Sequence, residues 1–299
     1  MDTKISKITP RGFCKGVTDA WAVSKKMAKF YPNQKKYMIG WLVHNKSIIE
    51  ELEKSGIETI DDTNISRYEI IDNLNADKET IIIFSAHGTD PKAINLAKEK
   101  GFQVVDATCI YVTDTHEIIR EKLKENKIII FIGVKNHPET KSSLSLDERI
   151  ILVETPEDVD NLILDKNSQI FVTNQTTISV YDFYYVTKKL KEKFKNIEFK
   201  NDICNATKER QEAVINMDKS IDLLIVVGDK KSNNSKKLVD IGKEKQVESY
   251  LVSSEMDINK DWIKNKKHIG VTSGCSTPTQ ITNKVISFLE TFIEKKDER

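Results

Sequence analysis

The chain has 299 residues, a formal net charge of +1 and no strongly basic block, which argues against a general nucleic-acid or membrane-surface binding protein. Its hydrophobic content of 38%, its charged content of 31% and its mean hydropathy of −0.44 are those of an ordinary soluble globular protein. No apolar run approaches the ~20 residues of a membrane helix.

The N-terminal residues lack the apolar segment of a signal peptide. We therefore expect a cytoplasmic protein whose four cysteines are kept reduced. Thiols in that compartment are more often metal ligands or catalytic groups than disulfide partners.

Short apolar runs alternate with amphipathic stretches along the whole chain. The runs predict strands at 36–40, 80–86, 102–107, 127–134, 149–154, 169–173, 223–228 and 268–274. The amphipathic stretches predict helices at 46–56, 113–125, 182–194, 210–219 and 282–296. Strands that alternate with helices favour an α/β fold with mostly parallel sheets, in which ligands collect at the carboxyl ends of the strands.

Three of the four cysteines each stand where an apolar stretch gives way to the start of a helix. They are Cys14, Cys109 and Cys204, and both intervals between them are 95 residues. A helix start favours the thiolate form through its dipole and its backbone N–H groups, and so suits metal binding. The pattern predicts one metal centre built from three similar lobes. From position and spacing alone, three buried core cysteines are an equal alternative.

The spacing of these cysteines also bears on the kind of metal. Structural zinc sites usually show paired C-x2-C ligands, which this sequence lacks. Gly12 and Gly16 flank Cys14 and would let the backbone approach a bulky inorganic group. A [4Fe-4S] cluster normally takes four cysteines, so three would leave one iron open for substrate.

Polar side chains follow the predicted strands in place of plain turn formers. Each third of the chain offers two such loops, at 41–47 and 84–90, at 132–140 and 172–179, and at 226–235 and 271–278. The thirds therefore form a threefold repeat of architecture without detectable sequence identity.

Nine segments occur in the same order as the motifs of one protein family. They read PRGFCKGV, LVHN, SAHG, DATC, GVKNHPE, NQTTIS, ICNATKERQEAV, VVGDKKSNNSKKL and GVTSGCSTP. On these motifs the chain resembles, over residues 5–290, the LytB-type 4-hydroxy-3-methylbut-2-enyl diphosphate reductases, which are iron–sulfur enzymes of isoprenoid biosynthesis.

The resemblance implies three pseudo-symmetric α/β lobes around a central [4Fe-4S] cluster. The cluster would be held by Cys14, Cys109 and Cys204 with one open iron. The implied lobes are 16–108, 109–200 and 1–15 plus 201–290, the first strand packs with the last lobe, and 291–299 is a frayed tail.

The implied reaction is the reductive dehydroxylation of (E)-4-hydroxy-3-methylbut-2-enyl diphosphate to isopentenyl and dimethylallyl diphosphate. This is the last step of the methylerythritol phosphate (non-mevalonate) pathway. On the family pattern the substrate-binding residues are His44, His87, His137, Thr176, Ser232, Asn233, Asn234 and Ser276. Neutral or weakly basic donors and helix N-termini would then hold the diphosphate without an arginine clamp.

The implied catalytic residues are Glu139, His137 and Thr176, with Glu139 as the proton donor. A carboxyl in a closed pocket beside a dianionic ligand should have a raised pKa, as a general acid near neutral pH requires. Without the resemblance, Glu139 reads as an ordinary carboxylate at a helix N-terminus, and lone histidines read as structural groups.

The chain departs from the family pattern at three positions. Ile110 replaces the proline that usually follows the second cysteine, and Asn233 replaces the second of two paired serines. Cys275 stands where alanine is usual. It is a small-residue replacement, a redox liability, or a thiol that reaches the open iron.

Three other functions remain open on the sequence. A paralogue would reduce a related allylic substrate, a zinc-dependent hydrolase would use the same three cysteines, and an iron–sulfur sensor would bind a partner through its lobes. For the reductase, the absence of a glycine-rich flavin or nicotinamide fingerprint indicates that a small protein such as ferredoxin or flavodoxin supplies the electrons.

Overall fold

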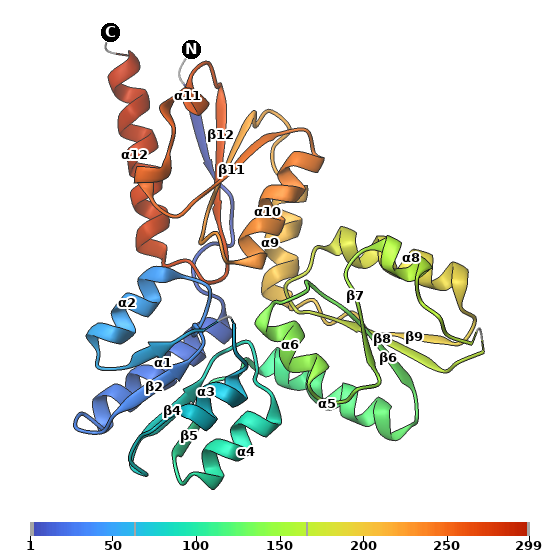
Figure 1. Ribbon diagram of the computed structural model, residues 1–299. Helices are drawn as coiled ribbons and strands as arrows, with labels where there is room; N and C mark the ends of the chain where they lie inside the picture. The colour runs from blue at the N-terminus through green and yellow to red at the C-terminus, as the bar shows by residue number, and fades with distance from the viewer. Residues whose placement is uncertain (1–2, 63, 166, 298–299) are drawn as a thin grey trace. The chain divides into compact units, whose positions relative to one another are not determined.

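The computed structural model describes residues 3–62, 64–165 and 167–297, and within them the strands form three four-stranded parallel sheets (Figure 1). The α/β fold class with three parallel-sheet lobes is confirmed. The chain divides into two compact units. The first comprises Met1–Lys15, His44–Lys46 and Asn205–Arg299, and the second comprises Gly16–Val43 and Ser47–Cys204. No helix among the described residues is long and apolar enough to cross a membrane.

The first unit contains one sheet, in the order β1-β12-β10-β11. Its strands are β1 (Lys4–Lys7), β10 (Leu223–Val227), β11 (Glu248–Val252) and β12 (His268–Ser273). Its helices are α9 (Asn205–Ile215), α10 (Asn233–Glu244), the 3-10 helix η1 (Glu255–Asp257), α11 (Lys260–Ile263) and α12 (Thr279–Asp297).

The second unit contains two sheets. The strand order of one is β3-β2-β4-β5, and its strands are β2 (Lys36–Ile39), β3 (Glu58–Ile60), β4 (Ile81–Phe84) and β5 (Gln103–Asp106). The helices of this part of the chain are α1 (Lys15–Phe30), α2 (Lys46–Lys54), α3 (Arg67–Asn73) and α4 (Pro91–Glu99).

The other sheet of the second unit has the order β7-β6-β8-β9. Its strands are β6 (Ile128–Ile132), β7 (Ile150–Val153), β8 (Ile170–Asn174) and β9 (Ile197–Phe199). Its helices are α5 (Ile110–Lys124), α6 (Pro138–Leu144), α7 (Pro156–Asp160) and α8 (Val180–Lys193).

All three sheets share one strand order. In each, the first strand of the lobe lies between the second and the third, and a fourth strand forms the edge beside the third. In the first unit the edge strand is β1, which pairs with β12 from the other end of the chain. The chain therefore repeats one topology three times. In each lobe the direction in which strands are added to the sheet reverses between the first and third strands. Ligands of open parallel sheets bind at this switch point.

The central strands are continuous apolar runs because helices cover both faces of each sheet. Strand β6 shows the alternation. Ile130 and Ile132 pack in a cluster with Leu190 of α8, whereas Ile129 and Phe131 pack in a second cluster that includes residues of α5. Truncating a fully buried side chain such as Leu190 to alanine should cost about 2–5 kcal/mol of stability.

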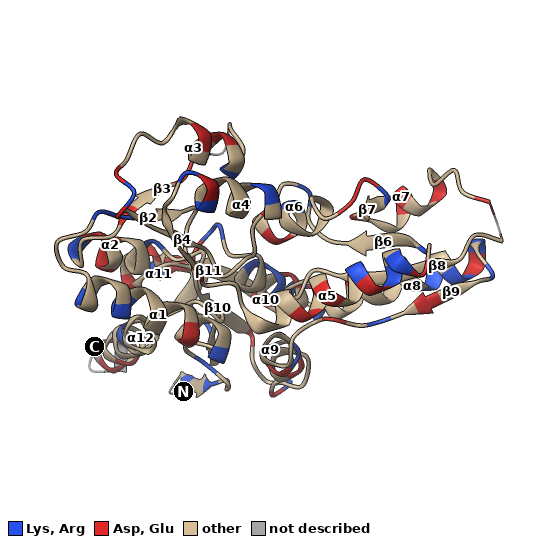
Figure 2. Ribbon diagram, turned by 90° about the horizontal axis from the view of Figure 1, so that it is seen from below, with Lys and Arg blue, Asp and Glu red and all other residues tan. Residues whose placement is uncertain are grey.

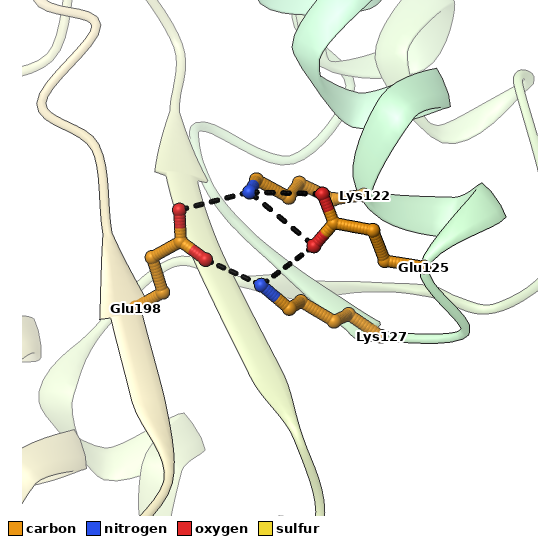
Figure 3. Close-up of polar contacts among 4 residues, drawn as sticks. All are labelled: Lys122, Glu125, Lys127 and Glu198. Atoms are coloured by element: carbon orange, nitrogen blue, oxygen red, sulfur yellow. Dashed lines mark hydrogen bonds and ion pairs between the residues drawn. The ribbon is translucent and has the colours of Figure 1, made fainter.

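Charged side chains lie on the outer surface of the β6–β9 sheet. Lys122, Glu125, Lys127 and Glu198 form a closed ring of ion pairs, in which Lys122 Nζ lies 3.0 Å and Lys127 Nζ 2.5 Å from the Glu198 carboxylate (Figure 3). The hydrogen bonds to Glu125 and Glu198 raise the pKa of Lys127. The ring joins the end of α5 to the edge strand β9.

Basic residues also gather on α8 (Figure 2). One of them, Lys193, donates to the backbone oxygens of Val159 at 2.7 Å and Leu162 at 2.9 Å. A cation at these carbonyls at the end of α7 satisfies acceptors that a helix C-terminus leaves open.

The predicted strands and helices are present, with shifted ends. Helix α9 begins at Asn205, five residues before the predicted start, and α5 and α8 begin at Ile110 and Val180. The lobe boundaries stay a prediction. The frayed tail predicted over 291–299 falls partly on α12, which continues to Asp297, and partly on residues 298–299, which lie outside the described residues.

Candidate functional site

Each cysteine of the predicted cluster follows the fourth strand of its lobe and directly precedes a helix. Its backbone N–H donates to a carbonyl in the loop after the third strand of the same lobe. The three hydrogen bonds are Cys14 to Cys275 at 3.1 Å, Cys109 to Ala86 at 3.0 Å and Cys204 to Thr176 at 3.1 Å. Each repeat of the threefold pattern predicted from the loops therefore contains an equivalent backbone hydrogen bond.

The three thiols are similar in environment. Cys14, Cys109 and Cys204 are half-buried, and Cys109 is the N-cap of α5, where its side chain makes no capping hydrogen bond. Within the second unit, Gly16 lies directly against Cys109. A Cβ atom at Gly16 would stand 2.4 Å from the Cys109 sulfur, so glycine keeps space for this thiol. Soft sulfur donors with such clearance fit a cluster of iron and sulfide.

Glu139 lies in the first turn of α6 and is 2% exposed. Its Oε1 accepts the backbone N–H of Thr176 at 2.6 Å, and its Oε2 accepts the Thr176 hydroxyl at 3.0 Å. Burial is the main cause that raises the pKa of this carboxyl to about 7, and the nearby charge of Asp202 also raises it. The two hydrogen bonds from Thr176 lower it by less. A carboxyl with this pKa can hold and release a proton near neutral pH.

His137 precedes Glu139 as the N-cap of α6. Its Nδ1 accepts the backbone N–H of Glu139 at 3.2 Å, and Pro138 occupies the first helical position, where its missing N–H costs nothing. The ring of His137 meets that of His87 edge to face, with centroids 5.4 Å apart. The structure thus brings Glu139, Thr176, His137 and His87 together within the second unit.

In the first unit, α10 starts at the loop after β10, the first strand of that lobe. Ser232 is its N-cap and accepts the N–H of Ser235 at 3.3 Å, and Asn233 and Asn234 form its first two positions. Backbone N–H groups and the positive end of the dipole at such a start suit an anion.

His44 belongs to the first unit, although it follows β2 in the chain. The Ser276 hydroxyl donates to the His44 carbonyl at 3.1 Å, and the N–H of Lys46 donates to Asp229 at 3.1 Å. His44 is therefore held by the loop of Ser276, and Lys46, two residues on, is held by the loop that precedes Ser232.

Cys275 is buried and held through its backbone. Its N–H donates to Asn234 Oδ1 at 3.0 Å, and its carbonyl accepts the N–H of Cys14. Its sulfur lies 3.9 Å from the carbonyl oxygen of Ala206. Asn234 uses its oxygen on Cys275, and its amide NH2 donates to the Thr207 hydroxyl at 3.4 Å; because an amide NH2 carries two hydrogens, it can also donate to an anion.

Ile110 occupies the first position of α5 and is 54% exposed. The helix therefore forms with isoleucine at this position.

Several residues that hold the site were missed from the sequence. Gln175 accepts the N–H of Val134 at 3.0 Å and donates to the Thr177 hydroxyl at 2.8 Å, linking two of the loops. Arg210 donates to the carbonyl of Gly12 at 2.8 Å, just before Cys14. Both lie within quoted motifs, and their burial among polar groups would have been the signal, but burial cannot be read from one sequence.

Comparison with known proteins identifies close relatives. The family model described as LytB protein matches residues 5–290. The chain is 61% identical to the 4-hydroxy-3-methylbut-2-enyl diphosphate reductase of Malacoplasma penetrans, over 96% of this chain and 97% of that protein. It is 43% identical to the enzyme of the same name from Anoxybacillus flavithermus, over 97% and 91%.

Two solved structures share the fold. The E-1-hydroxy-2-methyl-but-2-enyl-4-diphosphate reductase from Plasmodium falciparum superposes with a TM-score of 0.89 at 36% identity, covering 96% of this chain and 88% of that one. A structure of (E)-4-hydroxy-3-methyl-but-2-enyl diphosphate reductase, described as the terminal enzyme of the non-mevalonate pathway, gives a TM-score of 0.65 at 28% identity, covering 97% and 99%.

Proposed function

The chain belongs to the LytB protein family, and from this membership we propose that it reduces (E)-4-hydroxy-3-methylbut-2-enyl diphosphate to isopentenyl diphosphate and dimethylallyl diphosphate. The protein is an oxidoreductase of isoprenoid synthesis. The buried Glu139 supports the proposal, because loss of a hydroxyl as water needs a proton donor and this carboxyl is held by the Thr176 N–H and hydroxyl with its pKa raised to about 7. The match to named reductases over nearly the full length supports the substrate.

Cys14, Cys109 and Cys204 are the proposed ligands of a [4Fe-4S] cluster with one iron left open. The half-buried thiols at helix starts and the clearance that Gly16 gives to Cys109 support this assignment. When bound, such a cluster would supply electrons to the substrate. A ferredoxin or flavodoxin remains the proposed electron donor, and a cytoplasmic location stays a prediction.

Within the first unit, the proposed diphosphate-binding groups are His44, Ser232, Asn233, Asn234 and Ser276. Within the second unit, His87 is the proposed diphosphate-binding group, and His137 and Thr176 are proposed to form a hydrogen-bonded relay with the substrate oxygen. The start of α10 supports the first set, because its backbone N–H groups and the Asn234 amide can donate to phosphate oxygens.

Glu139 is the proposed general acid. In its ionised form it accepts both hydrogen bonds from Thr176, and in its protonated form it holds the proton that the departing oxygen takes. The Thr176 hydroxyl would carry the hydrogen-bonded link between this carboxyl and the substrate oxygen. His137 fixes the turn that presents Glu139, since its ring accepts the Glu139 N–H.

An anaerobic assay tests the proposal. Protein purified without oxygen is incubated with the hydroxylated diphosphate and a chemical reductant, and the two isoprenoid diphosphates are measured by mass spectrometry. The proposal requires a brown protein that forms both products. A colourless zinc protein without product would favour the hydrolase, and a brown protein that reduces no allylic diphosphate would favour the sensor.

A further inference from the structure

Arg67 makes three hydrogen bonds to the loop that carries His87. It is the first residue of α3, where Ser66 and Glu69 form a capping box that fixes the start of the helix. Its Nη1 donates to the carbonyl of Gly88 and to the Thr89 hydroxyl, both at 2.5 Å. Its Nη2 donates to the Ser85 hydroxyl at 2.8 Å. The guanidinium therefore contacts the loop on both sides of His87.

Arg67 is half-buried. Burial lowers its pKa to about 10, against the charges of Asp61 and Asp106, which raise it. The group therefore remains a cation at neutral pH. A planar fork of several donors in one place holds three oxygen atoms at fixed angles, which an ammonium group cannot reproduce.

The neighbouring backbone leaves room for this arrangement. A Cβ atom at Gly40 would stand 2.6 Å from Arg67 Nη2. Gly40 also has a φ of +76°, which favours glycine. On the open side, Arg67 and Thr89 border a cavity of about 400 Å³. Lysine, whose side chain is shorter than that of arginine, therefore fits at position 67 without a steric clash.

The opposite side of the same loop is held from α6. The Ser142 hydroxyl lies 3.1 Å from the His87 carbonyl oxygen, to which it can donate, and 3.3 Å from Nε2 of the buried His116. A Cβ atom at Gly88 would stand 2.7 Å from the Ser142 oxygen. Because α6 also carries Glu139, the loop of His87 is fixed to the helix of the proton donor.

We propose that Arg67 is a positioning residue that fixes the 85–89 loop and thereby holds the His87 ring in place for the substrate's diphosphate. The inference rests on the proposed role of His87 in binding diphosphate. Arg67 itself would not touch the substrate, so its loss should weaken binding more than it slows the chemical step.

The test uses two variants in the anaerobically purified holoenzyme. Arg67→Lys keeps the positive charge but loses the fork, and Thr89→Val removes one acceptor of the fork in a near-isosteric change. We expect Arg67→Lys to raise KM for the hydroxylated diphosphate about tenfold with kcat within about threefold, and Thr89→Val to change KM in the same direction by less. Hydrogen exchange of peptides spanning 85–89 should become faster in both.

Lys100→Met is the matched control. Lys100 donates to the carbonyls of Ile71 at 2.8 Å and Leu74 at 3.2 Å, at the other end of α3. This variant should lower the melting temperature but leave KM and exchange at 85–89 as in the wild type. In a His87→Ala background, Arg67→Lys should raise KM no further, because Arg67 would affect diphosphate binding only through the His87 ring, which alanine removes.

The inference is overturned if KM and exchange are unchanged in Thr89→Val and in any folded Arg67→Lys protein. It is also overturned if Arg67→Lys costs as much in the His87→Ala background as alone. If the wild type neither binds nor reduces the substrate, the proposed function fails. The exchange of 85–89 then still decides whether Arg67 fixes the loop.

Discussion

Both oxygens of the Glu139 carboxylate accept hydrogen bonds from one residue, Thr176, at 2.6 Å from its backbone N–H and 3.0 Å from its hydroxyl. Thr176 also offers its carbonyl to the N–H of Cys204. One loop residue thus links the proposed general acid to a proposed cluster ligand, within a single compact unit.

The pH profile should show the ionisation of Glu139. A proton donor must be protonated, and the pKa of Glu139 is raised to about 7, so kcat should fall about tenfold per pH unit above that value. Asp202 raises this pKa. Asp202→Asn should therefore move the falling limb to lower pH.

Asp160→Asn, an exposed carboxylate of the same unit that pairs with Lys189, is the control for this comparison and should leave the limb in place. If Asp202→Asn leaves the pH of the falling limb unchanged, or moves it to higher pH, the limb cannot be assigned to Glu139.

Thr176→Val removes the hydroxyl and retains the backbone donor. Because the hydroxyl bond lowers the pKa of Glu139, its loss should move the same limb to higher pH. It should also reduce kcat by about tenfold through loss of the link to the substrate oxygen. Unchanged rates and an unchanged pH profile would remove Thr176 from the relay.

Gly16→Ala tests the cysteine site through metal content instead of activity. The new Cβ would stand 2.4 Å from the Cys109 sulfur, so we expect less iron per chain in a protein with wild-type far-ultraviolet circular dichroism. Thr18→Ala, an exposed change in the same turn of α1, should retain full iron. Full iron in Gly16→Ala would show that Cys109 does not need this clearance.

Cys275→Ala should leave turnover and the Mössbauer spectrum of the cluster unchanged. The hydrogen bonds from Cys275 to Asn234 and from Cys14 to Cys275 use backbone atoms, which alanine retains. A changed signal of the open iron would instead identify the Cys275 thiol as a ligand of it.

The sequence predicted the buried strands well, because an uninterrupted apolar run such as Leu223–Val227 has few other uses in a soluble protein. It missed β3, β9 and β11. These strands lie at sheet edges, where charged residues such as Glu198 alternate with apolar ones. It also missed the short helix α3, whose few residues give no helical period.

The raised pKa of Glu139 was expected from a closed pocket beside a dianionic ligand. In the structure, burial is its main cause. The roles of Arg67, Ser142 and Gln175 could not be predicted, since each contacts a loop 18 to 55 residues away in the chain. Such contacts depend on how the sheets and helices pack, which cannot be read from the residue pattern of one sequence.

The most direct measurement compares the wild type with Glu139→Gln at equal iron content, in the anaerobic assay with the hydroxylated diphosphate. Glutamine keeps the size of the side chain but holds no ionisable proton. We expect Glu139→Gln to lose at least about a hundredfold in the formation of isopentenyl and dimethylallyl diphosphate, with unchanged cluster absorbance. Wild-type rates in Glu139→Gln would contradict the role of Glu139 as the proton donor.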